Sequence, residues 1–412
     1  MKRVIVVGGG ASGTIAAIAS ARKGAKVTLL EKNTQALKKL LVTGNGRCNF
    51  TNRDQRLTHY RSRHPERVAP ILQAHTMEET VSFFEELGLM VKERKGCLYP
   101  NSGQAASVAD LLRLEIRRLG VKEAYHTEVL DIRKKGDLFL VQTEGWTYEA
   151  EALILACGSM AAPKTGSTGD GYRFAEKLGH TVLEPLPALT GLYTREKDVA
   201  TLAGVRMDAK VTLLVEQKLC AEEEGEVQFT SYGLSGIPIF QVSRYASWAL
   251  FEGNMCEIFL DFMAPYTWED LVEILQKKRA YTEERKGTDV LLGVFPEKLS
   301  LLLLRRAGIS LKKKRKEWTD SEIHKLAEQI KGMHFEIVRC RGYEQAQVCT
   351  GGVPLTEIKE TTMESVKVEG LYFAGELLDV DGACGGYNLQ WAFTSGTLAG
   401  RAAAEDEKER RV

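Results

Sequence analysis

The chain has 412 residues, of which 44% are hydrophobic and 27% are charged, and its formal net charge at pH 7 is +1. These values are typical of a soluble globular protein with two or three domains and a sizeable core. A near-zero net charge provides no overall field that attracts nucleic acid or an anionic membrane, so we expect neither as a partner.

The cysteine pattern indicates free thiols. The eight cysteines form no C-x-x-C pair, and no cysteine–histidine cluster has the spacing of a zinc site. The sequence contains no cleavable leader pattern and no apolar run of 18 residues. We therefore expect a cytoplasmic protein in a reducing compartment, with no metal site and no membrane span.

The first 31 residues have the pattern of a dinucleotide-binding unit. An apolar strand at 4–7 precedes Gly8-x-Gly10-x-x-Gly13, a helix follows, and a second strand at 27–30 ends at Glu31. The glycines allow a tight turn, close approach to a pyrophosphate and close helix packing, and Glu31 can accept hydrogen bonds from a ribose diol. We expect this unit to bind an ADP moiety; the alternative is a βαβ unit without ligand. The pattern alone leaves NAD and FAD open.

A second glycine-containing loop follows at 43–52. Gly44 and Gly46 flank Asn45, which tolerates positive φ, and the sharp turn is expected to leave several N–H groups free. Arg47 adds a planar cation. This loop suits a diphosphate or the polar edge of a flavin, the alternative being a purely structural turn. Cys48 is expected to serve the turn through its backbone rather than as a nucleophile.

Helices are expected at 76–88, where Thr76 and Glu79 form a capping box, and at 107–119. Strands are expected at 122–126, 138–143 and 146–149, together making a small sheet. Between them, Val129 lies where a strand can offer backbone groups to an adenine edge.

A second buried strand at 152–156 breaks into a small-residue turn, which lets Ala156 and Gly158 pass close to a cofactor, whereas Cys157 is expected to pack.

From 190 to 262, short alternating stretches indicate an antiparallel, barrel-like domain. The acidic residues 222–225 are expected to form a turn, and 229–236 a polar, glycine-rich loop. From 267 the pattern becomes helical, with starts at Thr267-x-x-Asp270, Pro296 and Thr319-x-x-Glu322. The basic run 312–316 is expected to be solvated surface; the alternative is a docking patch for an anionic partner or an NADPH phosphate.

The last segment returns to strand, glycine loop and helix, with a buried strand at 370–374 and a helix starting near Gly386. The N–H groups of residues 386–390 can stabilise negative charge at the N1–O2 side of a reduced isoalloxazine. Two cradles at opposite ends of the chain favour FAD over NAD, which needs only the first. The predicted domains are 1–189 with 351–412 for FAD, 190–265 with 335–350 for a barrel-like substrate domain, and 266–334 for a helical subdomain.

These motifs together resemble one family, the BaiN-like flavoproteins, also called YhiN-like or aminoacetone-oxidase-like. The resemblance rests on the Gly8–Glu31 unit, on 43–52, 166–172 and 229–236, and on 374–376 with 381–390, and it covers essentially the whole chain. It implies an α/β fold with a glutathione-reductase-type Rossmann FAD domain, an inserted β-barrel-like domain and a small helical subdomain. Cys97, Tyr99 and Ser159 replace residues common in the family, an arginine, a phenylalanine and a glycine.

With these motifs, the expected FAD contacts are Gly8, Gly10, Ala11, Ser12, Gly13, Glu31, Lys32, Gly44, Asn45, Arg47, Cys48, Asn49, Val129, Ala156, Gly158, Gly375, Glu376, Gly386, Tyr387, Asn388, Leu389 and Gln390.

The resemblance implies an FAD-dependent oxidoreductase that reduces an alkene conjugated to a ketone, as in 3-oxo bile acids. Such a reaction needs hydride from flavin N5 to the β-carbon, a hydrogen-bond donor at the carbonyl oxygen and an acid for the α-carbon. Tyr232, in the glycine-rich loop, is our candidate acid or carbonyl donor; the alternative is a packed tyrosine.

The electron donor is open, because the sequence holds no second strand with G-x-G-x-x-G. NAD(P)H is expected to dock transiently over the flavin, or a protein donor serves instead. Two rival functions remain: an FAD-dependent amine or aminoketone oxidase that uses O₂, and an RNA-directed flavoprotein, which the near-neutral charge disfavours. The expected substrate is small and hydrophobic.

Overall fold

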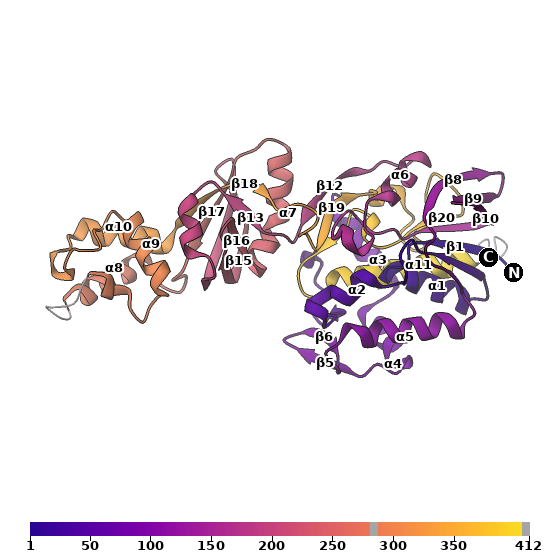
Figure 1. The fold of residues 1–412 in the computed structure, drawn as a ribbon, viewed down its shortest axis with the longest axis horizontal. Coiled ribbons are helices and arrows are strands. Elements are labelled where there is room, and N and C mark those ends of the chain that lie inside the picture. Colours follow the sequence, from indigo (N-terminus) through magenta and orange to yellow (C-terminus); the bar gives the residue numbers. More distant parts are fainter. Residues whose placement is uncertain (281–286, 406–412) are drawn as a thin grey trace. The chain divides into compact units, whose positions relative to one another are not determined.

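The computed structural model describes residues 1–280 and 287–405 (Figure 1). The chain forms two compact units, Met1–Leu186 with Gln347–Val412, and Pro187–Ala346. The helices are α1 (Ala11–Arg22), α2 (Lys38–Val42), α3 (Val68–Ala74), α4 (Met77–Glu86), α5 (Ala105–Arg118), α6 (Asp170–Lys177), α7 (Ile237–Phe251), α8 (Trp268–Ala280), α9 (Glu297–Arg306), α10 (Asp320–Lys331) and α11 (Tyr387–Ala404).

A parallel sheet of five strands lies at the centre of the first unit, in the order β20-β11-β1-β2-β7. Its strands are β1 (Arg3–Val7), β2 (Lys26–Leu30), β7 (Lys122–Ala124), β11 (Ala152–Leu155) and β20 (Leu371–Phe373). Parallel sheets are covered on both faces, which explains the continuous apolar runs in β1 and β11. The strands expected near 4–7, 27–30, 152–156 and 370–374 all belong to this sheet, so the Rossmann expectation is confirmed.

Helices α1 and α11, from opposite ends of the chain, pack against each other (Figure 1). A Cβ on Gly396 would lie 2.4 Å from the carbonyl oxygen of Ser12, and one on Gly400 would lie 2.3 Å from that of Ala16. Only glycine permits this close approach of the two backbones. The contact places the glycine turn that precedes α1 in the same unit as the start of α11.

The smaller sheets of the first unit differ in part from the expectation. Their strands are β3 (Thr51–Asn52), β4 (Tyr60–Arg61), β5 (Val91–Arg94), β6 (Cys97–Pro100), β8 (Val129–Lys135), β9 (Leu138–Thr143), β10 (Trp146–Ala150), β12 (Leu183–Ala188), β19 (Val348–Gly352) and β21 (Asp381–Gly382). The expected sheet of 122–126, 138–143 and 146–149 is wrong in one member: β7 pairs with β2 in the central sheet, and β8 takes its place beside β9. The second half of β8 is polar, so its sequence does not show the alternation of apolar and polar residues that is typical of a strand.

The second unit contains a closed barrel in the order β13-β16-β15-β14-β17-β18. Its strands are β13 (Leu192–Thr194), β14 (Arg206–Val215), β15 (Lys218–Phe229), β16 (Gly233–Gly236), β17 (Cys256–Asp261) and β18 (Met333–Cys340). Buried side chains of the barrel and of helices α8 to α10 belong to one hydrophobic core. The barrel-like and helical expectations are therefore confirmed, and the two parts share their interior.

The turn of the long hairpin in the barrel is not where the acidic residues predict it. Residues 222–225 lie inside β15, where Glu222 pairs with Thr212 across the ladder. The chain reverses at Glu216 and Gln217, which have φ of 49° and 62°. Two successive residues with positive φ form a two-residue hairpin turn, whose twist matches that of the flanking strands. Neither residue is the asparagine or glycine that usually occupies such a turn. Residues 233–236, expected in a loop, form β16.

The basic run 312–316 is only partly solvated surface. Lys312, Lys314 and Lys316 are exposed, whereas Arg315 is buried and the Lys313 ammonium lies 2.8 Å from Glu322. Lys313 thus pairs with a residue of α10, and the segment that contains Arg315 contacts α8. The capping boxes at Thr76 and Thr319 form as expected. Among the helices that the structure describes, none has the length and hydropathy needed to cross a membrane.

Candidate functional site

The turn between β1 and α1 is built for close approach. Gly8 has φ of 103°, and a Cβ there would lie 2.5 Å from the carbonyl oxygen of Ala156. A Cβ on Gly13 would lie 1.9 Å from the Gly8 carbonyl oxygen, whereas one on Gly10 would meet nothing within 4 Å. Gly10 caps α1 without a side-chain hydrogen bond. The first N–H groups of α1, including those of Ala11 and Ser12, therefore adjoin open space that suits a diphosphate.

Glu31 braces this turn. Its Oε2 accepts a 2.7 Å hydrogen bond from the Gly9 N–H, and its Oε1 accepts from both nitrogens of Asn33, also at 2.7 Å. Oε1 therefore uses both of its lone pairs, whereas Oε2 retains one that a ribose hydroxyl can use. Lys32 is engaged elsewhere, because its ammonium lies 2.5 Å from Asp170. Its side chain ties the second strand to the 166–172 segment.

The loop at 43–49 turns through left-handed residues. Gly44, Asn45 and Cys48 have φ of 56°, 54° and 56°. The expected free N–H groups are in part used: those of Arg47 and Cys48 donate to the carbonyls of Gly44 and Thr43. Burial raises the pKa of the Cys48 thiol to about 12. The thiol is thus protonated and a poor nucleophile, as expected.

The same loop ends at a buried acceptor that has no partner among the described residues. This atom is Oδ1 of Asn49. A Cβ on Gly386 would lie 2.9 Å from it and 2.7 Å from the carbonyl oxygen of Thr51, so the loop and the start of α11 are in contact. An acceptor beside the N–H donors of a helix start fits the pyrimidine edge of a flavin, which alternates carbonyls with an N–H. The residues present fit FAD.

Two side chains at the start of α11 hold the loops together. The Gln390 amide accepts from Thr51 and donates to Thr80 and Thr394 at 2.7 to 3.0 Å. The Asn388 amide accepts from the Gly382 N–H and donates to its carbonyl, each at 2.8 Å. Their side chains therefore order the site, and we assign any contact of Tyr387, Asn388 and Leu389 with the cofactor to their backbone N–H groups.

Gly375 and Glu376 follow β20. Gly375 contacts helices α1 and α11, and Glu376 contacts helix α2 and Ser159. A Cβ on Gly375, whose φ is 77°, would lie 2.4 Å from the Ser12 hydroxyl. Glu376 accepts from Lys39 at 2.7 Å and from Ser159 at 2.8 Å. The family-atypical Ser159 is buried and is thus part of a partly buried polar cluster with Lys39 and Glu376.

The remaining expected contacts also belong to the first unit. Ala156 continues β11, Gly158 has φ of 73°, and Val129 begins β8. The atypical Cys97 accepts a 3.5 Å hydrogen bond from Asn52. All expected FAD contacts therefore belong to the first unit.

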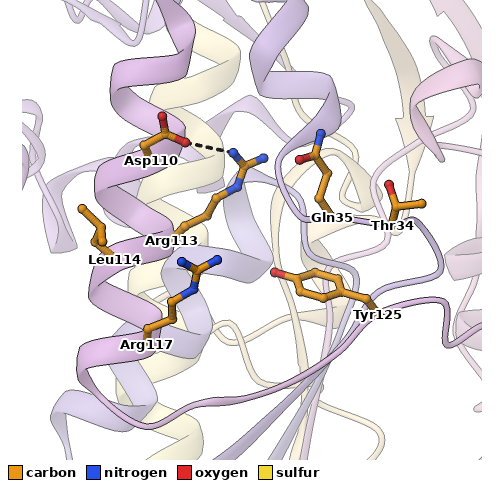
Figure 2. A pocket seen from close by; sticks show the side chains of 7 residues that line it. All are labelled: Thr34, Gln35, Asp110, Arg113, Leu114, Arg117 and Tyr125. Atoms are coloured by element: carbon orange, nitrogen blue, oxygen red, sulfur yellow. Dashed lines mark hydrogen bonds and ion pairs between the residues drawn. The ribbon is translucent and has the colours of Figure 1, made fainter.

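A polar pocket of about 480 Å³ lies beside the segment that follows Glu31 (Figure 2). It is lined by Thr34, Gln35, Asp110, Arg113, Leu114, Arg117 and Tyr125. Arg113 is paired with Asp110 at 3.0 Å and donates to the Ala36 carbonyl, and Arg117 lies 3.8 Å from Glu123. The arginine charges are thus balanced, and none of the expected FAD contacts lines this pocket.

The sequence reading missed a histidine beside α11. His59 stacks on Tyr387, with ring centroids 4.5 Å apart and an interplanar angle of 21°. Its Nε2 lies 2.9 Å from Oδ2 of Asp54, and Arg56 lies 2.6 Å from the same carboxylate. The available signal was weak: a lone histidine in an irregular segment, shortly after the 43–52 loop.

Tyr232 lies in the second unit, in the loop between β15 and β16. Its hydroxyl oxygen accepts from Arg341 at 3.4 Å, and the guanidinium carbon lies 4.6 Å from the ring centre. The ring also lies 4.9 Å from that of Tyr193. Its hydroxyl approaches Gly191 so closely that a Cβ there would be 2.6 Å away. The phenol is thus held at the barrel by a cation.

Comparison with known proteins gives consistent results. The family described as HI0933-like protein Rossmann domain matches residues 2–402. The chain is 41% identical over 415 residues to the 3-dehydro-bile acid delta(4,6)-reductase of Clostridium scindens, covering 98% of this chain and all of that protein. It is 31% identical to the ribosomal RNA dihydrouridine synthase of Haemophilus influenzae, covering 95% and 96%.

Among solved structures, the chain resembles the 3-ketosteroid delta1-dehydrogenase of Sterolibacterium denitrificans. The TM-score is 0.51 at 13% identity, and the match covers 98% of this chain and all of that one. This likeness bears on the fold alone.

Proposed function

The chain belongs to the HI0933-like family, the BaiN-like flavoproteins, and from this membership we propose an NAD(P)H-driven reductase of a C=C bond conjugated to a ketone. The chain is an FAD-dependent oxidoreductase. The proposed substrate is hydrophobic and steroid-like. The single observation that carries the proposal is the 41% identity, over nearly the whole chain, to a bile acid reductase.

When bound, FAD supplies the hydride that the β-carbon accepts. The chain's own residues position it: the glycine turn receives the diphosphate, Glu31 the ribose hydroxyls, and Asn49 with the start of α11 the pyrimidine edge. Polar side chains buried around Gln390 hold these segments in one geometry. Such preorganisation is the protein's contribution to the rate.

The carbonyl oxygen of the substrate gains negative charge during reduction and needs a donor. We assign this role to Tyr232, the candidate of the sequence analysis. Arg341 donates to the phenol oxygen at 3.4 Å, which leaves the phenol proton to be donated onward to the substrate's carbonyl oxygen.

NAD(P)H is proposed as the electron donor, with a protein donor as the alternative. The sequence offers no second dinucleotide-binding unit that would hold it. Nicotinamide would then dock transiently rather than in a domain of its own.

A second candidate substrate is a uridine in ribosomal RNA, favoured by the 31% identity to an enzyme of that name. The chemistry is the same class, since the C5=C6 bond of uridine is conjugated to its C4 carbonyl. The net charge of +1 and the partial burial of the 312–316 run favour the small substrate over RNA.

The test is a product analysis with purified, FAD-loaded protein. A 3-oxo-Δ4 bile acid, an RNA fragment containing uridine and an aminoketone are each incubated with NADH or NADPH. The proposal expects the steroid to gain two hydrogen atoms at its conjugated bond. If the uridine of the RNA fragment is saturated instead, the enzyme acts on RNA. If the aminoketone is oxidised and hydrogen peroxide is released, the enzyme is an oxidase, which contradicts the proposal.

A further inference from the structure

The reduction proposed above needs an acid for the α-carbon, and the first unit presents one group suited to it. His59 lies on Tyr387, the first residue of α11, and its side chain is 25% exposed, whereas Tyr387 is buried. The ring is therefore reachable by a ligand while one of its faces is fixed by the residue that opens the FAD-facing helix.

The carboxylate of Asp54 fixes the orientation of the ring. It lies 2.9 Å from Nε2, so the neutral ring carries its proton on Nε2 and turns Nδ1 away from Asp54. Nδ1 has no partner among the residues that the structure describes. Hydrogen bonds from Arg56 and His59 lower the pKa of Asp54, which keeps this carboxylate ionised. An ionised carboxylate 2.9 Å away stabilises the positive charge that the ring carries when it is protonated on both nitrogens.

The backbone ties this histidine to the FAD-binding loops. The carbonyl of His59 accepts a 2.8 Å hydrogen bond from Ala383, and β4, which begins at Tyr60, pairs with β21 at Asp381–Gly382. The loop at 383–386 then leads directly into α11. Backbone hydrogen bonds therefore tie His59 to the segment that precedes α11.

Few other ionisable groups face this point. Arg56 is engaged with Asp54, and Tyr60 meets Tyr387 edge-on at 5.5 Å. Burial, followed by the charges of Asp54 and Cys97, raises the pKa of Tyr387 to about 12, and burial raises that of Tyr60 further. Neither phenol therefore gives up its proton easily. Of these groups, the imidazole is the one whose side chain most often serves as a general acid.

We propose that His59 is the catalytic acid that protonates the α-carbon, with Asp54 as its positioning residue; this inference rests on the proposed function. The C=C bond is reduced by two electrons: a hydride from the reduced cofactor forms the C–H bond at the β-carbon, leaving an enolate. The proton on Nδ1 of His59 forms the C–H bond at the α-carbon, and the neutral imidazole regains a proton from solvent. The electron pair originates in NAD(P)H.

The kinetic test uses single-turnover reoxidation of the reduced, FAD-loaded enzyme by a 3-oxo-Δ4 steroid. His59→Ala should slow this step by about 10²- to 10⁴-fold, the usual contribution of a positioned acid. Bleaching of the flavin by NAD(P)H should change by less than a factor of about three. Added imidazole should restore part of the lost rate to His59→Ala, because a small acid can enter the space left by the ring. His64→Ala is the matched control: His64 lies in the same segment, pairs with Glu66 at 3.4 Å and should leave both steps unchanged.

A second readout does not depend on turnover. Imidazole ¹⁵N spectra of the apoprotein should show the neutral His59 ring protonated on Nε2, and Asp54→Asn should redistribute the proton between the two nitrogens. Melting of His59→Ala and its FAD affinity should match the wild type, which separates a chemical role from a structural one.

The outcomes are distinct. Slow reoxidation of His59→Ala, rescued by imidazole, supports the inference. Reoxidation of this variant at the wild-type rate, or a neutral ring whose single proton is on Nδ1 instead of Nε2, overturns it while the proposed function stands. If even the wild-type flavin is not reoxidised by any enone, the proposed function fails first and the role of His59 falls with it.

Discussion

A side chain at Gly13 would place its Cβ 1.9 Å from the carbonyl oxygen of Gly8, at the point where β1 turns into α1. No residue with a Cβ fits there without moving the strand end or the helix start. The two glycines thus fix how closely the first helix approaches the sheet, and with it the shape of the diphosphate cradle.

Gly13→Ala should therefore cost more than a surface substitution. The displaced helix start is expected to weaken FAD binding at least about 100-fold, because the N–H groups no longer converge on the diphosphate. Fluorescence titration of apoprotein with FAD measures this loss. Gly342→Ala is the control, since a Cβ there meets nothing within 4 Å. FAD affinity of Gly13→Ala within threefold of the wild type would contradict this reading of the turn.

Asn49→Ala should weaken FAD binding without destabilising the apoprotein. Its buried Oδ1 finds no partner among the described residues, so its removal should leave the apoprotein's stability unchanged or raise it by up to about 1 kcal/mol. FAD affinity should fall by about tenfold as one hydrogen bond to the flavin is lost. Denaturant melts of the apoprotein and FAD titration check the two effects. A less stable apoprotein with intact affinity would show that Asn49 is structural.

The stability of the first unit should depend on pH through His75. Burial lowers the pKa of this imidazole to about 4 from its usual 6.5, and its Nε2 lies 3.3 Å from the Thr80 hydroxyl. Between these values the unfolded chain binds more protons than the folded one, so stability is complete above pH 6.5 and is lost as the pH falls toward 4. The loss should reach about 3 kcal/mol.

His75→Gln isolates this contribution, because the wild type and the variant share every other titrating group. Urea midpoints at pH 7.5, 5.5 and 4.5 should fall more steeply for the wild type than for the variant. Parallel curves would show that His75 titrates normally in the folded state.

The hairpin between β14 and β15 offers a stabilising change. Gln217 has φ of 62°, a conformation that disfavours any side chain, and glycine adopts it without strain. Gln217→Gly should raise the apparent melting temperature of the second unit, corresponding to a gain of up to about 1 kcal/mol. Lys218→Gly, one residue on and inside the strand, should lower it. If both variants lose stability, the turn does not use left-handed residues.

Sequence patterns predicted the parts of this chain whose cause is local. Capping boxes at Thr76 and Thr319, the buried strands of the central sheet and the glycine turn each depend on residues a few positions apart, and each forms as expected. Failures occurred where a partner distant in sequence decides. The Glu222 segment has the composition of a turn, but in the fold it pairs with β14. Lys313 and Arg315 have the composition of solvated surface, but in the fold Lys313 pairs with Glu322 of α10 and Arg315 is buried.

The candidate site divides in the same way. The spacing of the glycines and of Glu31 indicates a nucleotide site, whereas the side-chain partners of Asn388 and Gln390 are visible only in the structure, where their amides bond to Gly382 and Thr80. Their predicted contact with the cofactor stays a prediction. His59 has no pattern of its own, and only the stacking on Tyr387 singles it out.

The most direct test of the central claim is anaerobic stopped-flow spectroscopy of the purified protein. The FAD-loaded enzyme should be yellow, should bleach on mixing with NADH or NADPH, and should recover its absorbance when a 3-oxo-Δ4 bile acid is added. Bleaching by an aminoketone, with recovery only on admission of O₂ and release of hydrogen peroxide, would contradict the account.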